Sequence, residues 1–259
     1  MQAKYFIRKV INKFSLLPKK KQCNICEKKV FDFLPLPDHY QKNFLKYGFP
    51  HTQKGAFESI DVDHFFCPDC YCMDRERLYA WYLKNNIRLH DDYTLLDFAP
   101  SVSLSKWIQK NFAIKYVTAD LFMDNVDVKT DIEDMQVFAA ESFDFVICSH
   151  VMEHVNDDVK AMGEIFRVLK IGGEAIIMAP ILRNFDGVDE DPTCHNVAER
   201  WNRFGQDDHI RLYSQKVFSQ RLQHVGFKLK FVTEKEIAVS DIIQFGIPQN
   251  VVLYIAQKT

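Results

Sequence analysis

Apolar runs and amphipathic stretches alternate along the second half of the chain. Four apolar runs have the length of buried strands: residues 93–98, 115–120, 143–148 and 174–179. The stretch 157–169 repeats apolar side chains at helical spacing, and Gly172 and Gly173 are expected to stop that helix. Two further helical patterns and a terminal strand pair complete the series: 104–109, 214–225, 228–232 and 251–256. The alternation predicts an α/β fold with a Rossmann-like, doubly wound and mostly parallel sheet.

A ligand is expected at the carboxyl ends of these strands. In a doubly wound sheet the ligand lies beyond those ends, near the point at which the strand order reverses. The residues that follow the apolar runs are therefore the candidate site: Asp97 to Ser103, Asp120, Asp131, Ile132, Ser149, His150 and the residues from Pro180 onward.

Two Cys-x-x-Cys pairs precede this region, Cys23 with Cys26 and Cys67 with Cys70. Each two-residue spacer lets one turn present two sulfurs to the same ion, so the four thiolates predict a tetrahedral zinc site. Cys72 is interpreted as the spare thiol. A site closed by four thiolates leaves no position for substrate, so the zinc is expected to be structural. The alternative is two pairs of reduced, buried thiols.

The first residues of the chain form a basic amphipathic pattern without an acidic residue. Such a helix suits an anionic membrane surface or a protein partner, and it equally suits packing on the protein's own surface. The predicted organisation is a basic helix over 1–22, a small zinc-binding module with a linker helix over 23–88, and a doubly wound domain over 89–259. An insertion near 183–213 is expected to face the substrate.

Composition narrows the class of protein. The 259 residues are 47% hydrophobic, which is enough for a buried core, and the formal net charge of −2 gives no reason to expect a dedicated nucleic-acid binder. Neither a run of about 20 apolar residues nor a signal-peptide pattern occurs, so a cytoplasmic protein is expected, with the inner membrane face as an alternative location for the basic helix.

Several segments together resemble class I S-adenosylmethionine-dependent methyltransferases of the type 11 kind. They are the loop from Asp97 to Ser103, then Asp120, Asp131 and Ile132, the segment 143–154 with Ser149, His150, Glu153 and His154, and the segment 166–173. The later segment 190–211 resembles a bacterial subgroup that has an N-terminal four-cysteine module. Members of this subgroup are often found with surface-polysaccharide biosynthesis functions. The resemblance covers about residues 60–230.

The resemblance implies S-adenosylmethionine as the cofactor and a role for each matched residue. Asp120 would accept hydrogen bonds from the ribose hydroxyls, with Leu121 beside it. Asp131 would bind the adenine amino group, and Ile132 would pack on the ring or present its backbone N–H. The methionine moiety and the methyl group would face five further residues: Asp97, Ala99, Ser101, Ser149 and His150.

The loop after the first strand departs from the family pattern. The family has glycine where this chain has Ala99, Ser101 and Ser103, and the whole chain contains only nine glycines. Glycine supplies backbone angles open to no other residue and a close approach to the cofactor. Alanine and serine are the mildest replacements, and the cofactor has no phosphate to cradle, so the loop is still expected to bind it.

Polar residues crowd between 184 and 213. His209 is expected as a general base and Arg211 as an anchor for an anion or a carbonyl, while His150 is expected beneath the methyl group. The segment from His150 to His154 also spells a zinc-protease motif, but that site needs a helix, and this segment directly follows a strand. Glu153 and His154 are interpreted as packing or helix-start residues, with a divalent ion as the alternative.

The sequence therefore predicts an S-adenosylmethionine-dependent methyltransferase that O-methylates a sugar, a glycan precursor or another small molecule. Two alternatives remain: an RNA methyltransferase whose zinc module recognises RNA, and a scaffold whose glycine-poor loop no longer holds cofactor. The expected partner is a small-molecule or glycan acceptor, with a membrane or protein partner as an option for the N-terminal helix; nucleic acid is not expected. The oligomeric state is left open.

Overall fold

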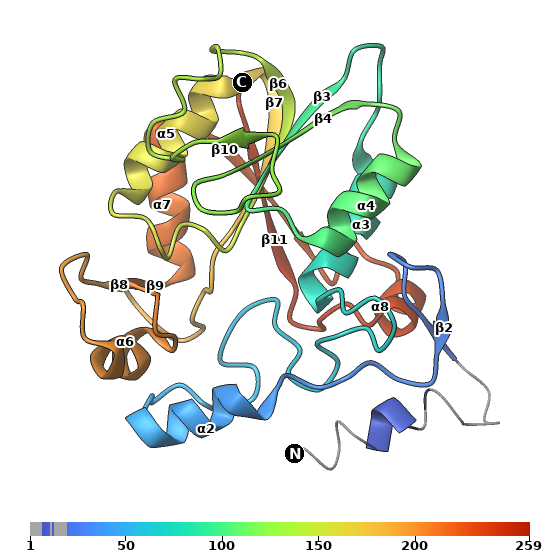
Figure 1. Ribbon diagram of the computed structural model, residues 1–259, viewed down its shortest axis with the longest axis vertical. Coiled ribbons are helices and arrows are strands. Elements are labelled where there is room, and N and C mark those ends of the chain that lie inside the picture. The colour runs from blue at the N-terminus through green and yellow to red at the C-terminus, as the bar shows by residue number, and fades with distance from the viewer. Residues whose placement is uncertain (1–6, 11, 13–19) are drawn as a thin grey trace.

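The computed structural model describes residues 7–10, 12 and 20–259, and a seven-stranded sheet lies at its centre (Figure 1). Its order is β10-β11-β7-β6-β3-β4-β5. The strands are β3 (Thr94–Phe98), β4 (Lys115–Asp120), β5 (Val128–Lys129), β6 (Phe143–Ser149), β7 (Leu169–Met178), β10 (Lys228–Thr233) and β11 (Val252–Gln257). The strands from β3 to β7 pair in parallel, and β11 runs antiparallel to β7 and β10. The predicted doubly wound sheet and its terminal strand pair are confirmed.

Helices cover both faces of this sheet. They are α3 (Asp74–Asn86), α4 (Val102–Asn111), α5 (Asp158–Val168) and α7 (Gln215–Val225). Figure 1 shows α3 and α4 together on one side of the sheet and α5 and α7 on the other. Ser101, Asp157 and Ser214 begin α4, α5 and α7, because each side chain accepts a hydrogen bond from a backbone N–H of the first turn.

Gly172 and Gly173 do not stop α5, so that prediction is wrong. The helix ends at Leu169, which has an extended backbone, and both glycines lie within β7. Gly172 has a φ of 83°, and a Cβ on Gly173 would lie 2.9 Å from the carbonyl oxygen of Lys170 and 3.0 Å from that of Asp144. Gly172 therefore provides a left-handed backbone conformation, and Gly173 permits a close backbone approach beside β6.

The helix predicted as a linker, α3, is also a layer of the sheet domain. The Tyr79 hydroxyl lies 2.8 Å from the hydroxyl of Ser149, and the Tyr82 hydroxyl donates to Glu174 at 3.0 Å. The Tyr82 ring lies 6.5 Å from the ring of Phe145 on β6. Because α3 shares one buried core with the central strands, it fixes its N-terminal residues relative to the sheet.

The cysteine segment is attached to the C-terminal part of the chain through Arg77. A short hairpin, β1 (Lys21–Gln22) with β2 (Lys29–Val30), opens this segment, and α8 (Val239–Phe245) lies beside it. The fully buried Arg77 guanidinium donates to the carbonyls of Phe245 and Gly246 at 2.7 and 2.9 Å. The cation also lies over the ring of Phe33, 3.9 Å from its centroid. This arrangement joins the two ends of the chain in one core.

Two segments distant in sequence combine to form a cap. It consists of α2 (Asp38–Tyr47) with its following loop, and of α6 (Val197–Phe204) with the two-stranded sheet β8 (Val188–Glu190) and β9 (Arg211–Tyr213). The Tyr47 and Trp201 rings stack with centroids 6.0 Å apart. The Glu58 N–H donates to the carbonyl of Ile181 at 3.0 Å, so the cap connects to the chain just beyond β7. A second apolar cluster, which includes Phe49 and Phe204, fills it.

Most of the predicted basic helix over 1–22 lies outside the described residues. Residues 7–10 and 12 are helical. Arg8 donates to the carbonyl of Phe33 at 3.1 Å, and the Asn12 amide donates to that of Asp32 at 2.8 Å, so this described part packs on the protein itself. Within the described ranges, the helices are too short or too polar to cross a bilayer.

Candidate functional site

The carboxyl edge of the parallel strands carries the predicted site residues. Strand order reverses between β3 and β6, because the chain continues from β3 to β4 on one side and returns to β6 on the other. Ala99 follows β3 and His150 follows β6, so both lie at the reversal point. Their φ angles are positive, 55° for Ala99 and 58° for His150. Each such residue costs on the order of 1–2 kcal/mol, so the surrounding structure holds both turns.

The glycine-poor loop takes a conformation that glycine usually provides. Ala99 occupies the left-handed region at the first of the three replaced positions. Ser101 accepts a hydrogen bond from the backbone N–H of Leu104 at 3.2 Å and so caps α4. Ser103 donates to the carbonyl of Cys70 at 2.8 Å, which connects this loop with the cysteine segment. All three replacements are accommodated without distorting the strand or the helix.

Asp120 ends β4 with a carboxylate that is held in place. Its Oδ1 atom accepts hydrogen bonds from the backbone N–H groups of Phe122 and Met123, both at 2.7 Å. Its Oδ2 atom accepts no hydrogen bond from the described residues. The side chain of Leu121 is exposed beside it. This leaves one oxygen of an oriented carboxylate for a ligand.

The loop after β5 lies next to that of β4. The Thr130 N–H donates to the carbonyl of Asp120 at 3.2 Å, so the two loops run together. Asp131 accepts a hydrogen bond from the backbone N–H of Glu133 at 2.9 Å. The Ile132 side chain is buried in the core, so its backbone is the part that a ligand can reach.

The Asp97 side chain is buried and has a hydrogen-bond partner within the fold, so it does not face solvent. Its side chain is 2% exposed, and Oδ2 accepts a hydrogen bond from the Tyr116 hydroxyl at 2.6 Å. Burial raises the pKa of Asp97 to about 7, although the hydrogen bond from Tyr116 opposes this shift. Asp97 therefore supports the loop from within the sheet. Its buried side chain offers no surface to the methionine moiety, which it was expected to face.

We expect Asp97→Asn to stabilise the protein above neutral pH. The folded protein holds a proton on Asp97 up to about pH 7, whereas an unfolded aspartate loses it near pH 4. The associated stability is present below about pH 4 and is lost as the pH rises toward 7. Asparagine keeps an oxygen for Tyr116 without the charge, so Tm should rise by roughly 2–6 °C at about pH 8. Thermal melts that show the same gain near pH 4 would contradict this assignment.

A cavity of about 310 Å³ opens beside the loop that follows β6. Its walls come from the sheet edge, the start of α3 and the cap. The lining combines polar side chains with aromatic ones: Arg75, His150, Glu153, His154 and His209, with Tyr40, Phe44, Phe57 and Phe204. A concave site of this size, with apolar walls and a few polar groups, is typical of small-molecule binding.

Three histidines surround Glu153 at this cavity. His150 Nδ1 lies 3.2 Å from Glu153 Oε1, and the Nε2 atoms of His154 and His209 each lie 3.9 Å from the same oxygen. Burial lowers the pKa of His150, and it lowers the pKa of His209 to about 4. The structure thus brings the predicted His150 and His209 together, with Glu153 between them.

The structure corrects the role expected for Arg211, because its guanidinium is not available to an acceptor. Arg211 is 2% exposed, and its Nε donates to Glu190 at 2.9 Å. Its other nitrogens donate to carbonyls of the loop after β6, those of Met152 at 2.8 Å, Val155 at 2.6 Å and Asn156 at 3.0 Å. Arg211 therefore fixes the loop that carries His150 and Glu153.

Sequence reasoning missed Arg75. It lies in the first turn of α3, and its side chain lines the cavity. Within the described part of the chain its guanidinium has no hydrogen bond or ion pair, and its charge contributes to lowering the pKa of His150. The charged stretch that begins at Asp74 was the one sign of it in the sequence. A helical pattern alone does not show which side chain of the helix points toward a ligand site.

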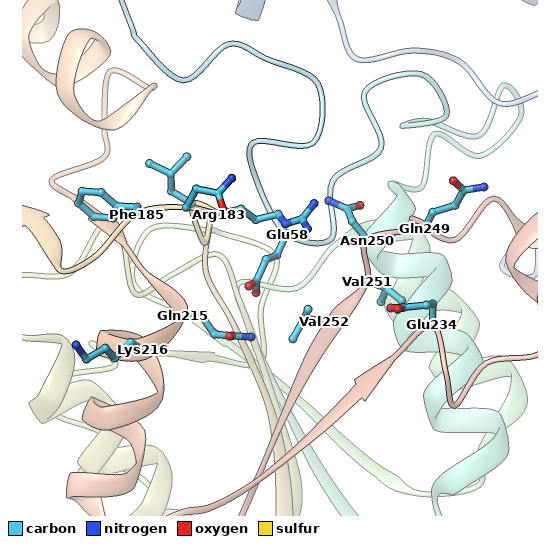
Figure 2. A pocket seen from close by; sticks show the side chains of 12 residues that line it. Glu58, Arg183, Phe185, Gln215, Lys216, Glu234, Gln249, Asn250, Val251 and Val252 are labelled. Atoms are coloured by element: carbon cyan, nitrogen blue, oxygen red, sulfur yellow. The ribbon is translucent and has the colours of Figure 1, made fainter.

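A larger cavity, of about 660 Å³, lies farther along the sheet edge at the start of β11 (Figure 2). Figure 2 shows Glu58 and Gln215 directed into it. Glu58 accepts a hydrogen bond from the Tyr254 hydroxyl at 2.7 Å. Leu182 to Phe185, from the segment expected to face the substrate, line this cavity, but none of the predicted cofactor-binding or catalytic residues does, and β11 is separated from the reversal point by β7 and β6. We therefore place the candidate site at the smaller cavity.

Five cysteine sulfurs gather between the β1–β2 hairpin and α3. The Sγ atoms of Cys23 and Cys70 lie 3.8 Å apart, as do those of Cys26 and Cys67. Sulfurs that bind one zinc ion tetrahedrally at about 2.3 Å lie about 3.8 Å from each other. The spacing between the sulfurs of the two predicted pairs therefore fits a zinc thiolate site.

Cys72 belongs to this cluster, so its interpretation as a spare thiol is corrected. Its Sγ lies 3.4 Å from that of Cys23, and the ligand atoms of Cys23, Cys67, Cys70 and Cys72 all lie within 4.8 Å of one another. Tyr71 has a φ of 59°, and this turn directs Cys72 back toward the other sulfurs. The spacing of the paired cysteines in the sequence gives no sign of that turn. The structure thus offers Cys72 as well as Cys26 for the fourth position.

Comparison with known proteins identifies the sheet region. Residues 80–177 match the family model described as a methyltransferase domain, Methyltransf_11. The chain contains a methyltransferase domain. The predicted enzyme class, an S-adenosylmethionine-dependent methyltransferase, is confirmed, and the matched residues include the loops after β3, β4 and β6. No curated protein matches the chain.

Solved structures share the fold of this methyltransferase domain. The [4+2]-cyclase SpnF is 14% identical, with 86% of this chain and 93% of SpnF covered and a TM-score of 0.52. A methyltransferase from Bacillus halodurans is 18% identical over 69% of this chain and 97% of its own, with a TM-score of 0.44. One from Archaeoglobus fulgidus is 17% identical over 71% and 91%, with a TM-score of 0.45. At 14% identity the likeness to SpnF shows the fold alone.

Proposed function

We propose that the methyltransferase domain transfers a methyl group from S-adenosylmethionine to a hydroxyl of a small polar molecule such as a sugar or a glycan precursor. The observation that carries this proposal is the cavity of about 310 Å³ beside the reversal point of the sheet. Its aromatic walls suit the apolar face of a sugar ring, and its polar groups suit hydroxyls. Arg75 adds a positive charge for an anionic group on the acceptor or on the cofactor.

The loops after β3, β4 and β5 are proposed to hold the cofactor. The oriented carboxylate of Asp120 would accept a ribose hydroxyl, and the neighbouring Asp131 loop would meet the adenine. Ala99 and Ser101 would turn the chain along the methionine moiety, with Ser149 and His150 across from them. S-adenosylmethionine supplies an electrophilic methyl group, and the protein aligns the acceptor with it.

His150 is our proposed general base. An alcohol must lose a proton as its oxygen is methylated, and a histidine within reach of the hydroxyl can accept it. His150 lies at the end of β6, where the cofactor loops and the cavity meet, and its Nδ1 faces Glu153. Its Nε2 atom is then the one for the acceptor. His209 is 3% exposed and more deeply placed, so we prefer His150 to it.

We also propose that the cysteine cluster binds one structural zinc ion, with Cys23, Cys67, Cys70 and either Cys26 or Cys72 as ligands. Ser103 hydrogen-bonds to the carbonyl of Cys70, so the metal would stiffen the cofactor loop as well as its own segment. No observation favours RNA as the acceptor, since the net charge is −2 and the cavity has the size of a small molecule.

Mass spectrometry of reactions with S-adenosylmethionine and a panel of sugars and nucleotide sugars tests the proposed acceptor class. We expect an O-methylated product that is heavier by one CH2 unit, because the methyl group replaces the hydroxyl proton. His150→Ala should lower kcat by about 100-fold or more and leave cofactor affinity unchanged. The exposed His195, which lies outside the cavity, provides the control variant His195→Ala, with unchanged kcat. Full activity of His150→Ala, or methylation on nitrogen alone, would contradict the proposal.

A further inference from the structure

Glu153 carries a buried carboxylate whose charge the methyl-transfer scheme leaves without a cation, because its neighbour there, His150, acts as a neutral base. Its side chain is 0% exposed; His150 Nδ1 lies 3.2 Å from Oε1, and Oε2 has no hydrogen-bond partner in the described part of the chain. A buried carboxylate without a partner costs several kcal/mol, so such a group needs a compensating cation. The lysine and arginine side chains of the described residues form no ion pair with Glu153.

The groups that face Glu153 are ligand atoms. His154 Nε2 and His209 Nε2 each lie 3.9 Å from Glu153 Oε1, and one ligand atom from each of the three residues lies within 4.8 Å of the others. These separations are too long for direct hydrogen bonds. Ligand atoms about 2.1 Å from one ion lie about 3.4 Å apart at tetrahedral angles. The two histidine–carboxylate distances exceed this value by about 0.5 Å, so the side chains would have to move closer together around an ion.

Neighbouring contacts already orient these ligands. The His154 Nδ1 atom lies 3.3 Å from the carbonyl oxygen of Asp208 and 3.5 Å from its carboxylate, which leaves Nε2 for a metal. The backbone N–H of Ile210 donates to the carbonyl of Glu153 at 3.0 Å and fixes the two segments relative to each other. Arg211 holds the same loop through the carbonyls of residues 152, 155 and 156.

We propose that Glu153, His154 and His209 bind a divalent transition-metal ion at the wall of the cavity. Two imidazoles and one carboxylate are the donor set of open zinc sites and of non-haem iron(II) sites. All three residues line the cavity, so the remaining coordination positions face its interior. The bound ion supplies the positive charge that Glu153 lacks, and the site is distinct from the cysteine cluster.

An ion in this position would contact the acceptor. Neighbouring hydroxyls of a sugar, or a hydroxyl with an adjacent carboxylate, are bidentate oxygen ligands for the open positions. This second step rests on the proposed function, whereas metal binding by the three residues does not. The experiment therefore measures metal without acceptor or cofactor, so that a wrong acceptor class leaves its outcome unchanged.

Metal content of the full chain after reconstitution with zinc tests the site. We expect about two zinc ions per chain, one at the cysteines and one at the cavity, and about one in Glu153→Gln. His154 is partly exposed, so His154→Gln is the variant that preserves folding and should also retain about one. His51 lines the same cavity outside the metal group, so His51→Gln should keep both ions.

Cobalt(II) added to protein that has been loaded with only one zinc ion per chain, at the cysteines, tests the location of the second ion independently of the zinc count. Nitrogen and oxygen ligands give weak visible absorption bands, whereas thiolates add intense charge-transfer bands in the near ultraviolet. We expect the weak bands in the wild type and in His51→Gln, and their loss in both other variants. One zinc ion in the wild type, without the weak cobalt bands, overturns the proposal and leaves protonated histidines as the countercharge of Glu153. Two ions in Glu153→Gln overturn it as well.

Discussion

Asp120→Ala is expected to weaken S-adenosylmethionine binding by about 100-fold. The Asp120 carboxylate lies at the end of β4 and has one oxygen without a protein partner, where a ribose hydroxyl would donate. A hydrogen bond to a charged group contributes roughly 1.5–3 kcal/mol, and a 100-fold loss corresponds to about 2.7 kcal/mol, so one such bond accounts for a loss of this size. Isothermal titration of the purified, zinc-loaded protein measures the change.

Two control variants separate this effect from damage to the loop. Asp120→Asn keeps an oxygen for the backbone N–H groups of Phe122 and Met123 but loses the charge, so its affinity should fall between those of the wild type and Asp120→Ala. Asp124 is an exposed acid on the same loop, and Asp124→Ala should bind like the wild type. An unchanged affinity of Asp120→Ala would show that the ribose lies elsewhere.

Cys67→Ser is expected to remove the structural zinc ion and to lower Tm by roughly 10 °C or more. Cys67 belongs both to the group of four mutually close cysteines and to the pair with Cys26, so either ligand set depends on it. A structural zinc site contributes folding free energy directly, and here the segment shares its core with the sheet. Zinc analysis and thermal melts measure the two effects.

Single serine variants also identify the fourth ligand. If Cys72 is the ligand, Cys72→Ser loses one zinc ion and Cys26→Ser keeps it; the reverse result assigns Cys26. Cys194 is buried in the cap, away from the cluster, so Cys194→Ser should retain the zinc. Full zinc content and an unchanged Tm in Cys67→Ser would show that the cluster is a set of reduced thiols.

Local patterns predicted the sheet well. Each apolar run is short and the helices between the runs have one apolar face, so the element types and the terminal strand pair followed from periodicity. The prediction for Gly172 and Gly173 was wrong because a glycine after a helix pattern usually indicates the helix end, whereas here Gly173 permits a close approach beside β6. That approach depends on residues almost thirty positions away and leaves no local pattern.

The sequence predicted the site residues that lie at strand ends. It did not predict the roles of residues whose contacts depend on the cap. Ala99, Asp120 and His150 were found because each is the last residue of a strand or directly follows one. Arg211 was assigned to an acceptor because exposed and buried arginines look alike in sequence, and only the folded loop shows its carbonyl partners. The role of Arg75 needs the contact between α3 and a cap assembled from two distant segments.

The most direct test of a functional cofactor site is isothermal titration of the zinc-loaded wild-type protein with S-adenosylmethionine. The geometry of the loops after β3 and β4, with Ala99 in the conformation that glycine usually provides, predicts saturable binding of one cofactor per chain, with a Kd below about 1 mM. A folded, zinc-loaded protein that shows no heat of binding and contains no co-purified cofactor would contradict the account.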